Sequence, residues 1–139
     1  MTFQATIETL LERTGASRTT LRLDRPDGFF PVVAEALAPG IRSIVDDTSI
    51  DLRASATFQS LARERRLLIQ SDLLAAEPAP PVELVELYGA RAQMLAPVVR
   101  NDALVGIVSV HYAPGPREWT DDDVAVLEEA VKQVLAELG

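Results

Sequence analysis

The spacing of apolar residues predicts an amphipathic helix near each end of the chain. Residues 2–13 place four apolar side chains on one stripe, and Gly15 follows as a stop signal. Near the other end, Thr120 is a suitable N-cap, and the aspartates after it put negative charge at the positive end of a helix dipole. Beyond them, apolar residues recur at alternating steps of three and four up to Leu138.

Alternation of polar and apolar residues predicts strands between these helices. Residues 17–23, SRTTLRL, place Thr19, Leu21 and Leu23 on one face and the intervening arginine and threonine side chains on the other. The turn DRPDG at 24–28 leads to a second strand near residues 29–36, which we expect to pair back as a hairpin.

The clearest signal is a long hairpin in the C-terminal half. Residues 90–99, ARAQMLAPVV, and residues 103–112, ALVGIVSVHY, are joined by a short turn. In that turn Asn101 and Asp102 tolerate the left-handed conformations that a tight hairpin requires. The prolines after residue 112 prevent a central strand from continuing.

The middle of the chain is less regular. We expect a loop at 41–54, a helix at 56–66, a short strand at 67–71, a break at 75–81 and a short helix at 82–88. Strands distributed in this way predict an α+β fold, in which an antiparallel sheet is covered on one face by the terminal helices.

The chain resembles a stand-alone GAF domain, and the resemblance covers nearly all of it as a single domain, residues 1–139. It is carried by SRTTLRL at 17–23, by the hairpin at 92–112 and by the closing segment at 119–138, WTDDDVAVLEEAVKQVLAEL. Within the hairpin, GIVS at 106–109 fits the family's Gly-apolar-apolar-Ser pattern, and Trp119 with Thr120 leads into the final helix as family members do.

The resemblance implies a central antiparallel sheet of about six strands with both terminal helices on one face. It also implies that the irregular middle covers a small-molecule pocket on the other face. Family members mostly sense ligands or mediate dimerisation, and many are fused to an output domain. We expect no such domain after the final helix, and we therefore expect signalling through a homodimer or a separate partner.

The sequence disagrees with three specialised branches of that family. The Asn-Lys-…-Phe-Asp-Glu signature of cyclic-nucleotide binders is missing. Covalent bilin attachment and methionine sulfoxide reduction both use cysteine, and the chain has none. Composition therefore leaves the ligand unknown and identifies no cofactor.

Charge and hydropathy narrow the possible partners. The formal net charge is −8, which disfavours nucleic acid and anionic membrane surfaces, because both attract clustered lysine and arginine. The longest apolar run, residues 103–110, is too short to span a bilayer. The N-terminus lacks the basic and apolar regions of a signal peptide, so we expect a cytoplasmic protein.

The alternation of residues along the strands also predicts which side chains bind the ligand. Polar side chains from three predicted strands converge on the face opposite the terminal helices, and we predict that these line the pocket: Thr20, Arg22, Gln93, Ser109 and His111. The planar guanidinium of Arg22 suits a carboxylate or a phosphate, because it bonds two oxygens at once.

His111 is the only histidine, and it admits three interpretations: a core residue satisfied by a hydrogen bond, a pocket contact, or a haem ligand. Ser109 and His111 lie two residues apart, but no G-x-S-x-G turn presents a nucleophile. A single histidine without cysteine also leaves zinc without ligands. We therefore expect that the protein is not an enzyme.

The helix stripes admit two roles: packing on the sheet, or pairing with a second copy in a four-helix interface. The residues in question are Phe3, Ile7, Leu10, Val124, Leu127, Val131, Val134 and Leu138. We predict a sensory domain that binds a small molecule as a homodimer. The alternative is a ligand-free dimerisation or protein-interaction module, in which Phe58, Leu61 and Leu74 fill the pocket.

Overall fold

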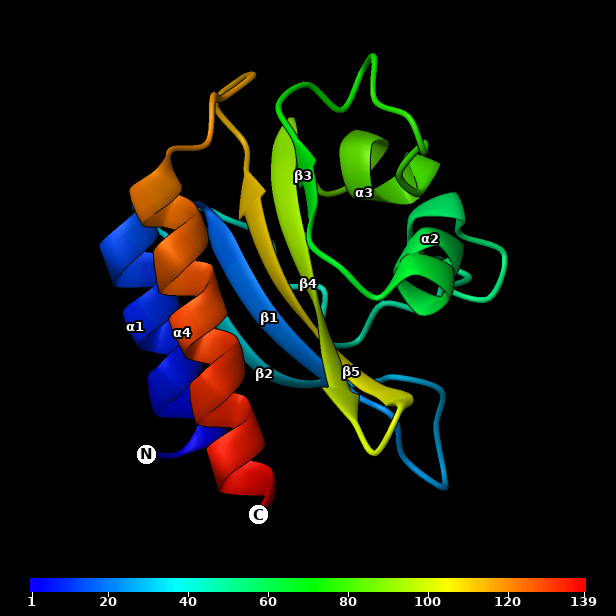
Figure 1. Ribbon diagram of the computed structural model, residues 1–139. Coiled ribbons are helices and arrows are strands. Elements are labelled where there is room, and N and C mark those ends of the chain that lie inside the picture. The colour runs from blue at the N-terminus through cyan, green and yellow to red at the C-terminus, as the bar shows by residue number, and fades with distance from the viewer.

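A computed structural model describes all residues from Met1 to Gly139. One antiparallel sheet, with strand order β2-β1-β5-β4-β3, separates two layers. Helices α1 and α4 lie side by side over one face, and α2 and α3 lie on the other side (Figure 1). The elements are α1 (Phe3–Thr14), β1 (Arg18–Leu23), β2 (Val32–Leu37), α2 (Ala56–Glu64), β3 (Leu68–Gln70), α3 (Val82–Glu86), β4 (Ala92–Arg100), β5 (Ala103–Tyr112) and α4 (Asp121–Leu138).

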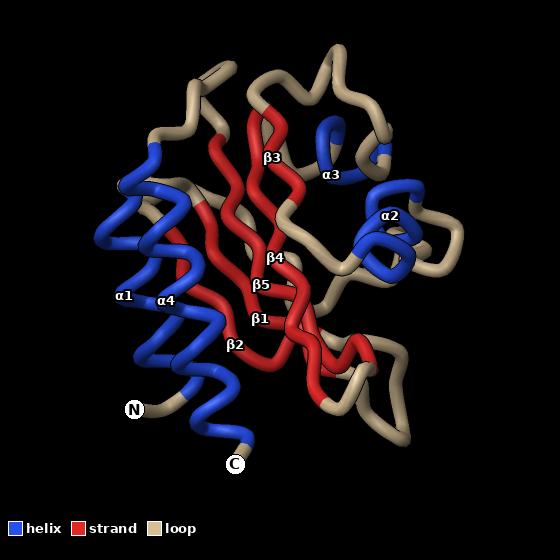
Figure 2. Tube along the Cα trace, in the orientation of Figure 1, coloured by secondary structure: helices blue, strands red, loops and turns tan.

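The predicted α+β class is confirmed, but the sheet has five strands rather than about six. Figure 2 shows all of them in a single curved layer. The segment between β2 and α2 forms no further strand, because its backbone groups bond locally. The N–H groups of Ser49 and Ile50 donate to the Asp47 carboxylate, and the N–H of Arg53 donates to Asp51. Such turns replace a strand ladder.

Both helix ends form as the sequence predicts. Thr120 caps α4 because its side-chain oxygen accepts a hydrogen bond from the Asp123 N–H at 3.1 Å, and the Asp123 carboxylate in turn accepts one from the Thr120 N–H at 3.0 Å. This reciprocal pair is a capping box. At the end of α1, Gly15 adopts a left-handed conformation with φ of 62°, which glycine tolerates without steric cost.

The hairpin turn between β4 and β5 also agrees with its prediction. Asn101 and Asp102 have φ of 53° and 62°, the left-handed values that a tight turn between these strands requires. The first hairpin differs in one detail, because β2 begins at Val32 and not near residue 29. Phe30 has φ of 53°, so the chain is still turning there.

The helix stripes pack on the sheet within one chain. Ile7, Leu10, Leu127 and Val134 are at most 1 % exposed and belong to a core cluster of 15 buried residues. The other predicted interface residues pack against that cluster, partly buried: Phe3, Val124, Val131 and Leu138. Four of the eight residues therefore belong to the core of the monomer and four lie only partly buried beside it, and their role in a dimer interface stays a prediction.

None of the helices combines the length and the apolar character that crossing a membrane requires.

Candidate functional site

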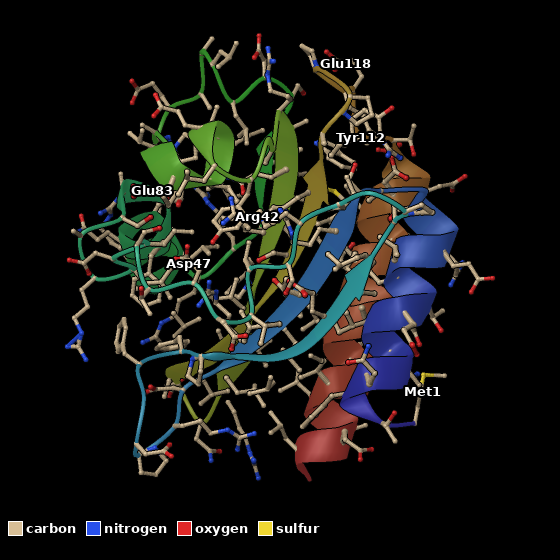
Figure 3. The ribbon with its side chains drawn as sticks, turned by 180° about the vertical axis from the view of Figure 1, so that it is seen from behind. Met1, Arg42, Asp47, Glu83, Tyr112 and Glu118 are labelled. Carbon is tan, nitrogen blue, oxygen red and sulfur yellow. The ribbon has the colours of Figure 1, made fainter.

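A cavity of about 50 Å³ lies between the sheet and the segments that cover its second face. The floor consists of polar residues from β1, β4 and β5 together with Leu95 and Ile107. The roof is mainly apolar and comes from the 41–54 loop, α2 and α3, with Ser55 and Thr57 as its polar members. Figure 3, turned by 180° from Figure 1, shows the covering loop in front of the sheet, with Arg42 and Asp47 labelled on it. All five residues predicted from alternation line this cavity: Thr20, Arg22, Gln93, Ser109 and His111.

Strand register explains why these side chains meet. Gln70, Gln93, His111 and Arg18 are directly opposite one another across β3, β4, β5 and β1. Directly opposed residues project from the same face of a sheet. The polar side chains therefore form a continuous row across the sheet, and a second row beside it contains Ser109 opposite Thr20.

His111 and Arg18 form a buried pair at the end of that row. Arg18 is 1 % exposed, and its Nη1 lies 3.2 Å from Nδ1 of His111. A guanidinium only donates, so Nδ1 accepts and the neutral imidazole carries its proton on Nε2. Burial, followed by the charges of Arg18 and Arg22, holds the pKa of His111 well below its ordinary value. At neutral pH His111 is therefore an uncharged donor at Nε2.

Two arginines without an ion-pair partner carry positive charge at this site: Arg22 lines the cavity, and Arg18 lies behind His111, which lines it. The ion pairs of the structure join other residues, and neither Arg18 nor Arg22 takes part. Burial lowers the pKa of both, although nearby acidic groups, Glu35 among them, act in the opposite direction. An arginine pKa starts near 12.5, so both side chains stay charged at neutral pH.

Arg18 and Arg22 differ in how much of the guanidinium is already bonded. Arg18 donates Nη1 to His111, and it donates Nε and Nη2 to the carbonyl oxygen of Arg42 at 3.2 and 2.6 Å. Arg22 donates only Nη1, to the carbonyl of Phe30 at 2.9 Å. Nε and Nη2 of Arg22 have no partner within the chain, so Arg22 retains a fork for another group.

The nearby carboxylates bind the covering loop instead of the arginines. Asp47 accepts hydrogen bonds from the Tyr88 hydroxyl and from Ser49 and Ile50 N–H groups. Burial alone would raise the pKa of Asp47, but these hydrogen bonds outweigh it and hold the pKa below its ordinary value. Glu35 accepts from Ser43 at 2.5 Å and from a backbone N–H of the same loop at 2.9 Å. Both carboxylates therefore hold the 41–54 loop in place over the cavity.

Two buried polar atoms at the cavity have no hydrogen-bond partner: Thr20 Oγ1 and Gln93 Oε1. The orientation of the Gln93 amide follows from its neighbours. Gln70 donates Nε2 to the carbonyl of Pro78 at 2.7 Å, and Gln93 donates Nε2 to Oε1 of Gln70 at 2.8 Å. A carbonyl only accepts, so this chain fixes Oε1 of Gln93 as an acceptor that lacks a donor.

A second, more open hollow adjoins the cavity. It has a volume of about 280 Å³ and shares Arg22, Ile44, Ile50 and Leu52 with it. Arg22 therefore stands between an interior space and a wider hollow beyond it.

Sequence reasoning missed two residues of the polar row, Arg18 and Gln70. Arg18 carried a usable signal, because it alternates with Thr20 and Arg22 along β1. Gln70 carried none, since its place depends on how the three-residue strand β3 pairs with β4. The expectation that Leu74 fills the pocket is wrong, because that side chain is 63 % exposed.

Comparison with known proteins gives one family and many similar structures. The GAF domain family model matches residues 1–138. The crystal structure of the cyanobacteriochrome TePixJ GAF domain superposes with a TM-score of 0.80 at 22 % identity, covering 98 % of this chain and 88 % of that one. A phycocyanobilin-bound GAF domain from a cyanobacterial phytochrome gives 0.78 at 17 % identity, with 98 % and 81 % coverage.

A third structure extends the same result. The photoproduct state of a GAF domain from Synechocystis sp. gives a TM-score of 0.76 at 17 % identity and covers 98 % of this chain and 96 % of that one. No curated protein sequence matches the chain. At these identities the structural likeness establishes the fold.

Proposed function

Because the chain belongs to the GAF domain family, we propose that it is a sensory domain that binds a small molecule between the sheet and its covering segments. The observation that carries the proposal is the pair of buried, unpartnered atoms at the cavity, Thr20 Oγ1 and Gln93 Oε1. Folded proteins satisfy nearly all such groups, and each one left unpaired costs about 1–3 kcal/mol. A bound molecule would offset that cost.

A bilin or a haem does not fit this cavity. Structures similar to this chain include GAF domains with bound phycocyanobilin or biliverdin. This chain has no cysteine to attach a bilin, and its cavity of about 50 Å³ is far below the roughly 300–1,000 Å³ of typical ligand pockets. Nδ1 of His111 accepts from Arg18 and Nε2 carries the proton, so neither ring nitrogen offers iron a free lone pair. These features support a ligand much smaller than a tetrapyrrole.

The proposal extends to how the domain works. It acts without catalysis, in the cytoplasm, as a homodimer that passes the ligand signal to a separate partner. The family resemblance supports the dimer, and the helix stripes would contribute to its interface through their partly buried residues, Phe3, Val124, Val131 and Leu138. Sedimentation at micromolar concentration tests the dimer, and a monomer throughout the range would contradict it.

Native mass spectrometry of the purified protein, with the denatured mass measured alongside, tests ligand binding. We expect extra mass that disappears on denaturation. A double variant, Arg22→Gln with His111→Gln, should lose that mass and keep its fold. The matched control is Arg63→Gln, because Arg63 is exposed on α2. Absence of extra mass, together with no shift in melting temperature on adding a metabolite extract, would contradict the proposal.

A ligand-free interaction module is the second candidate, and the small cavity favours it. Phe58 and Leu61 line the roof, and Leu61 is 1 % exposed, so part of the space is already filled by side chains. In that case the Arg22/His111 double variant would keep every partner interaction of the wild type. A loss of partner binding in the double variant alone would favour the sensory domain.

A further inference from the structure

The geometry points to a small hydroxycarboxylate, of about two or three carbons, as the class of ligand that this cavity takes. The inference rests on the proposed function and specifies the charge, the polar groups and the size of the bound molecule. Three features of the cavity support it: the free donors of Arg22, the unpartnered acceptor of Gln93 and the small volume.

The first feature is the free guanidinium fork of Arg22. Arg22 uses only Nη1, for the carbonyl of Phe30, and has no carboxylate partner within the chain. Arg18, which bonds the cavity residue His111, adds a second buried positive charge nearby, and each of its three nitrogens already has a partner. A partly buried cation with two unused donors binds a planar anion in a bidentate arrangement. The ligand therefore carries a carboxylate.

The second feature is the unpartnered acceptor on Gln93. Its Oε1 is fixed as an acceptor by the hydrogen-bond chain through Gln70 to Pro78, and Gln93 is 1 % exposed. An anion alone cannot satisfy this oxygen, because two acceptors do not bond each other. The ligand must also supply a donor.

The donor is a hydroxyl and not an ammonium group. Arg18 and Arg22 both line or adjoin the space, and the imidazole between Arg18 and Gln93 in the row is held neutral. Glu35 acts on both arginines and Asp47 on Arg22, but neither carboxylate lines the cavity. An ammonium group inside the cavity would therefore meet the guanidinium group of Arg22 and be repelled. A hydroxyl carries no charge, donates to Gln93 Oε1 and accepts from a donor such as Nε2 of His111 or the Thr20 hydroxyl.

The third feature is size. A cavity needs roughly 10–15 Å³ of this measure to hold a single water, and typical ligand pockets measure roughly 300–1,000 Å³, so about 50 Å³ accommodates only a very small molecule. A two- or three-carbon acid fits the space, whereas a sugar, a nucleotide or an aromatic acid does not. The adjoining hollow of about 280 Å³, also lined by Arg22, gives such a molecule a way in.

Calorimetric titration of the purified protein with a matched set of small molecules tests the inference. Lactate and glycolate supply both groups, propionate lacks the donor, lactamide lacks the charge, and alanine replaces the hydroxyl by ammonium. We expect lactate or glycolate to bind best, and propionate to bind about three- to tenfold more weakly because one hydrogen bond is lost. Lactamide and alanine should be weaker by about tenfold or more.

Variants of the protein connect these differences to the residues. Arg22→Gln should weaken lactate about tenfold or more. Gln93→Met should weaken lactate to the level of propionate and leave propionate unchanged. The control Arg63→Gln should change neither. Arg22→Gln should thus lose the preference for a charged ligand, and Gln93→Met should lose the preference for a hydroxyl. Residues with a merely structural role would not produce this separation.

Some outcomes would contradict the ligand class and leave the proposed sensory function standing. Alanine, lactamide or inorganic phosphate binding as tightly as lactate would exclude the hydroxycarboxylate class, as would lactate binding that survives Arg22→Gln. If the protein binds none of these probes but retains another molecule in native mass spectrometry, the ligand class is wrong and the sensory function stands. If nothing binds in either experiment, both proposals fail.

Discussion

Thr19 and Thr20 are neighbours in β1, and both are 0 % exposed, but they face opposite sides of the sheet. Thr19 Oγ1 donates to the carbonyl of Ile7 in α1 at 2.8 Å. Thr20 Oγ1 lines the cavity and has no partner. A threonine hydroxyl in β1 therefore has a hydrogen-bond partner on the face covered by α1 and α4, whereas the neighbouring threonine hydroxyl on the other face has none.

The contrast holds across the whole sheet. The helix-covered face has one continuous cluster of 15 buried residues. The cavity face has smaller clusters of five and four residues on either side of its polar rows, and two of the three unpartnered buried polar atoms line its cavity. Stability thus comes mainly from the helix face, while the cavity face keeps polar groups that cost stability and that a ligand can use.

Truncating the helix-face core should have the largest effect. Leu127 is 0 % exposed and packs between α4 and the sheet, so Leu127→Ala should reduce the free energy of unfolding by about 3 kcal/mol, from lost burial and the cavity left behind. Leu87→Ala is the control, since Leu87 is 48 % exposed, and it should change stability by about 0.5 kcal/mol or less. Urea denaturation measures both, and equal losses would contradict the assignment of Leu127 to the core.

Much of the helix face was predictable because its residues obey a local period. The stripe of α4 and the strict alternation of β1 each follow from spacing along the chain, without knowledge of what packs against them. The spacing did not decide which surface the apolar stripe of each terminal helix packs against. A helix that packs on a sheet and a helix that pairs with a second copy present the same pattern. In the folded chain four of the eight stripe residues are fully buried on the sheet and four only partly, so pairing with a second copy stays a prediction.

The cavity face was predictable where alternation applied and unpredictable where pairing decided the outcome. Thr20, Arg22, Ser109 and His111 were placed on the correct face by counting residues along β1 and β5. That Arg18 bonds His111 depends on register between two strands 93 residues apart in sequence. The loop at 41–54 has no period, so its turns on Asp47 had no readable signal.

Substitution of Gly106, where the backbone of β1 closely approaches β5, should have the next largest effect. A Cβ at Gly106 would lie 2.7 Å from the carbonyl oxygen of Arg22 and 2.8 Å from Cδ2 of Leu23. The carbonyl belongs to the paired strand and cannot move freely, so Gly106→Ala should cost about 2 kcal/mol through overpacking. Gly115→Ala is the control, because nothing lies within 4 Å of its Cβ. Thermal and urea unfolding should show a loss only for Gly106→Ala.

Acid should weaken the protein through the cavity face. His111 stays neutral in the folded state because burial and the charges of Arg18 and Arg22 lower its pKa, whereas the unfolded histidine titrates near pH 6.5. Above about pH 6.5 both states are neutral and pH has no effect through this residue. Below it the unfolded chain binds a proton that the folded chain does not, so stability falls by up to about 1.4 kcal/mol per pH unit.

Urea unfolding at pH 7.5 and pH 5.5 measures this dependence, with His111→Gln as the comparison. The amide of glutamine can accept from Arg18 but does not titrate. The wild type should lose about 1 kcal/mol between the two conditions, and the variant should lose less. Asp47 acts in a different window, because its lowered pKa affects stability only as the pH falls below about 4. A wild-type profile as flat as that of the variant would show that His111 is protonated when folded.

The smallest effect, and the sharpest comparison, comes from the two threonines. Thr19→Val removes a satisfied hydrogen bond to Ile7 and should cost about 1 kcal/mol. Thr20→Val has nearly the same shape and removes a hydroxyl with no partner, so ligand-free protein should be unchanged or stabilised by up to about 1 kcal/mol. Protein unfolded, dialysed and refolded before urea denaturation excludes a retained ligand. An equal loss in both variants would mean that the Thr20 hydroxyl is satisfied in solution, and the two faces would then not differ as the structure implies.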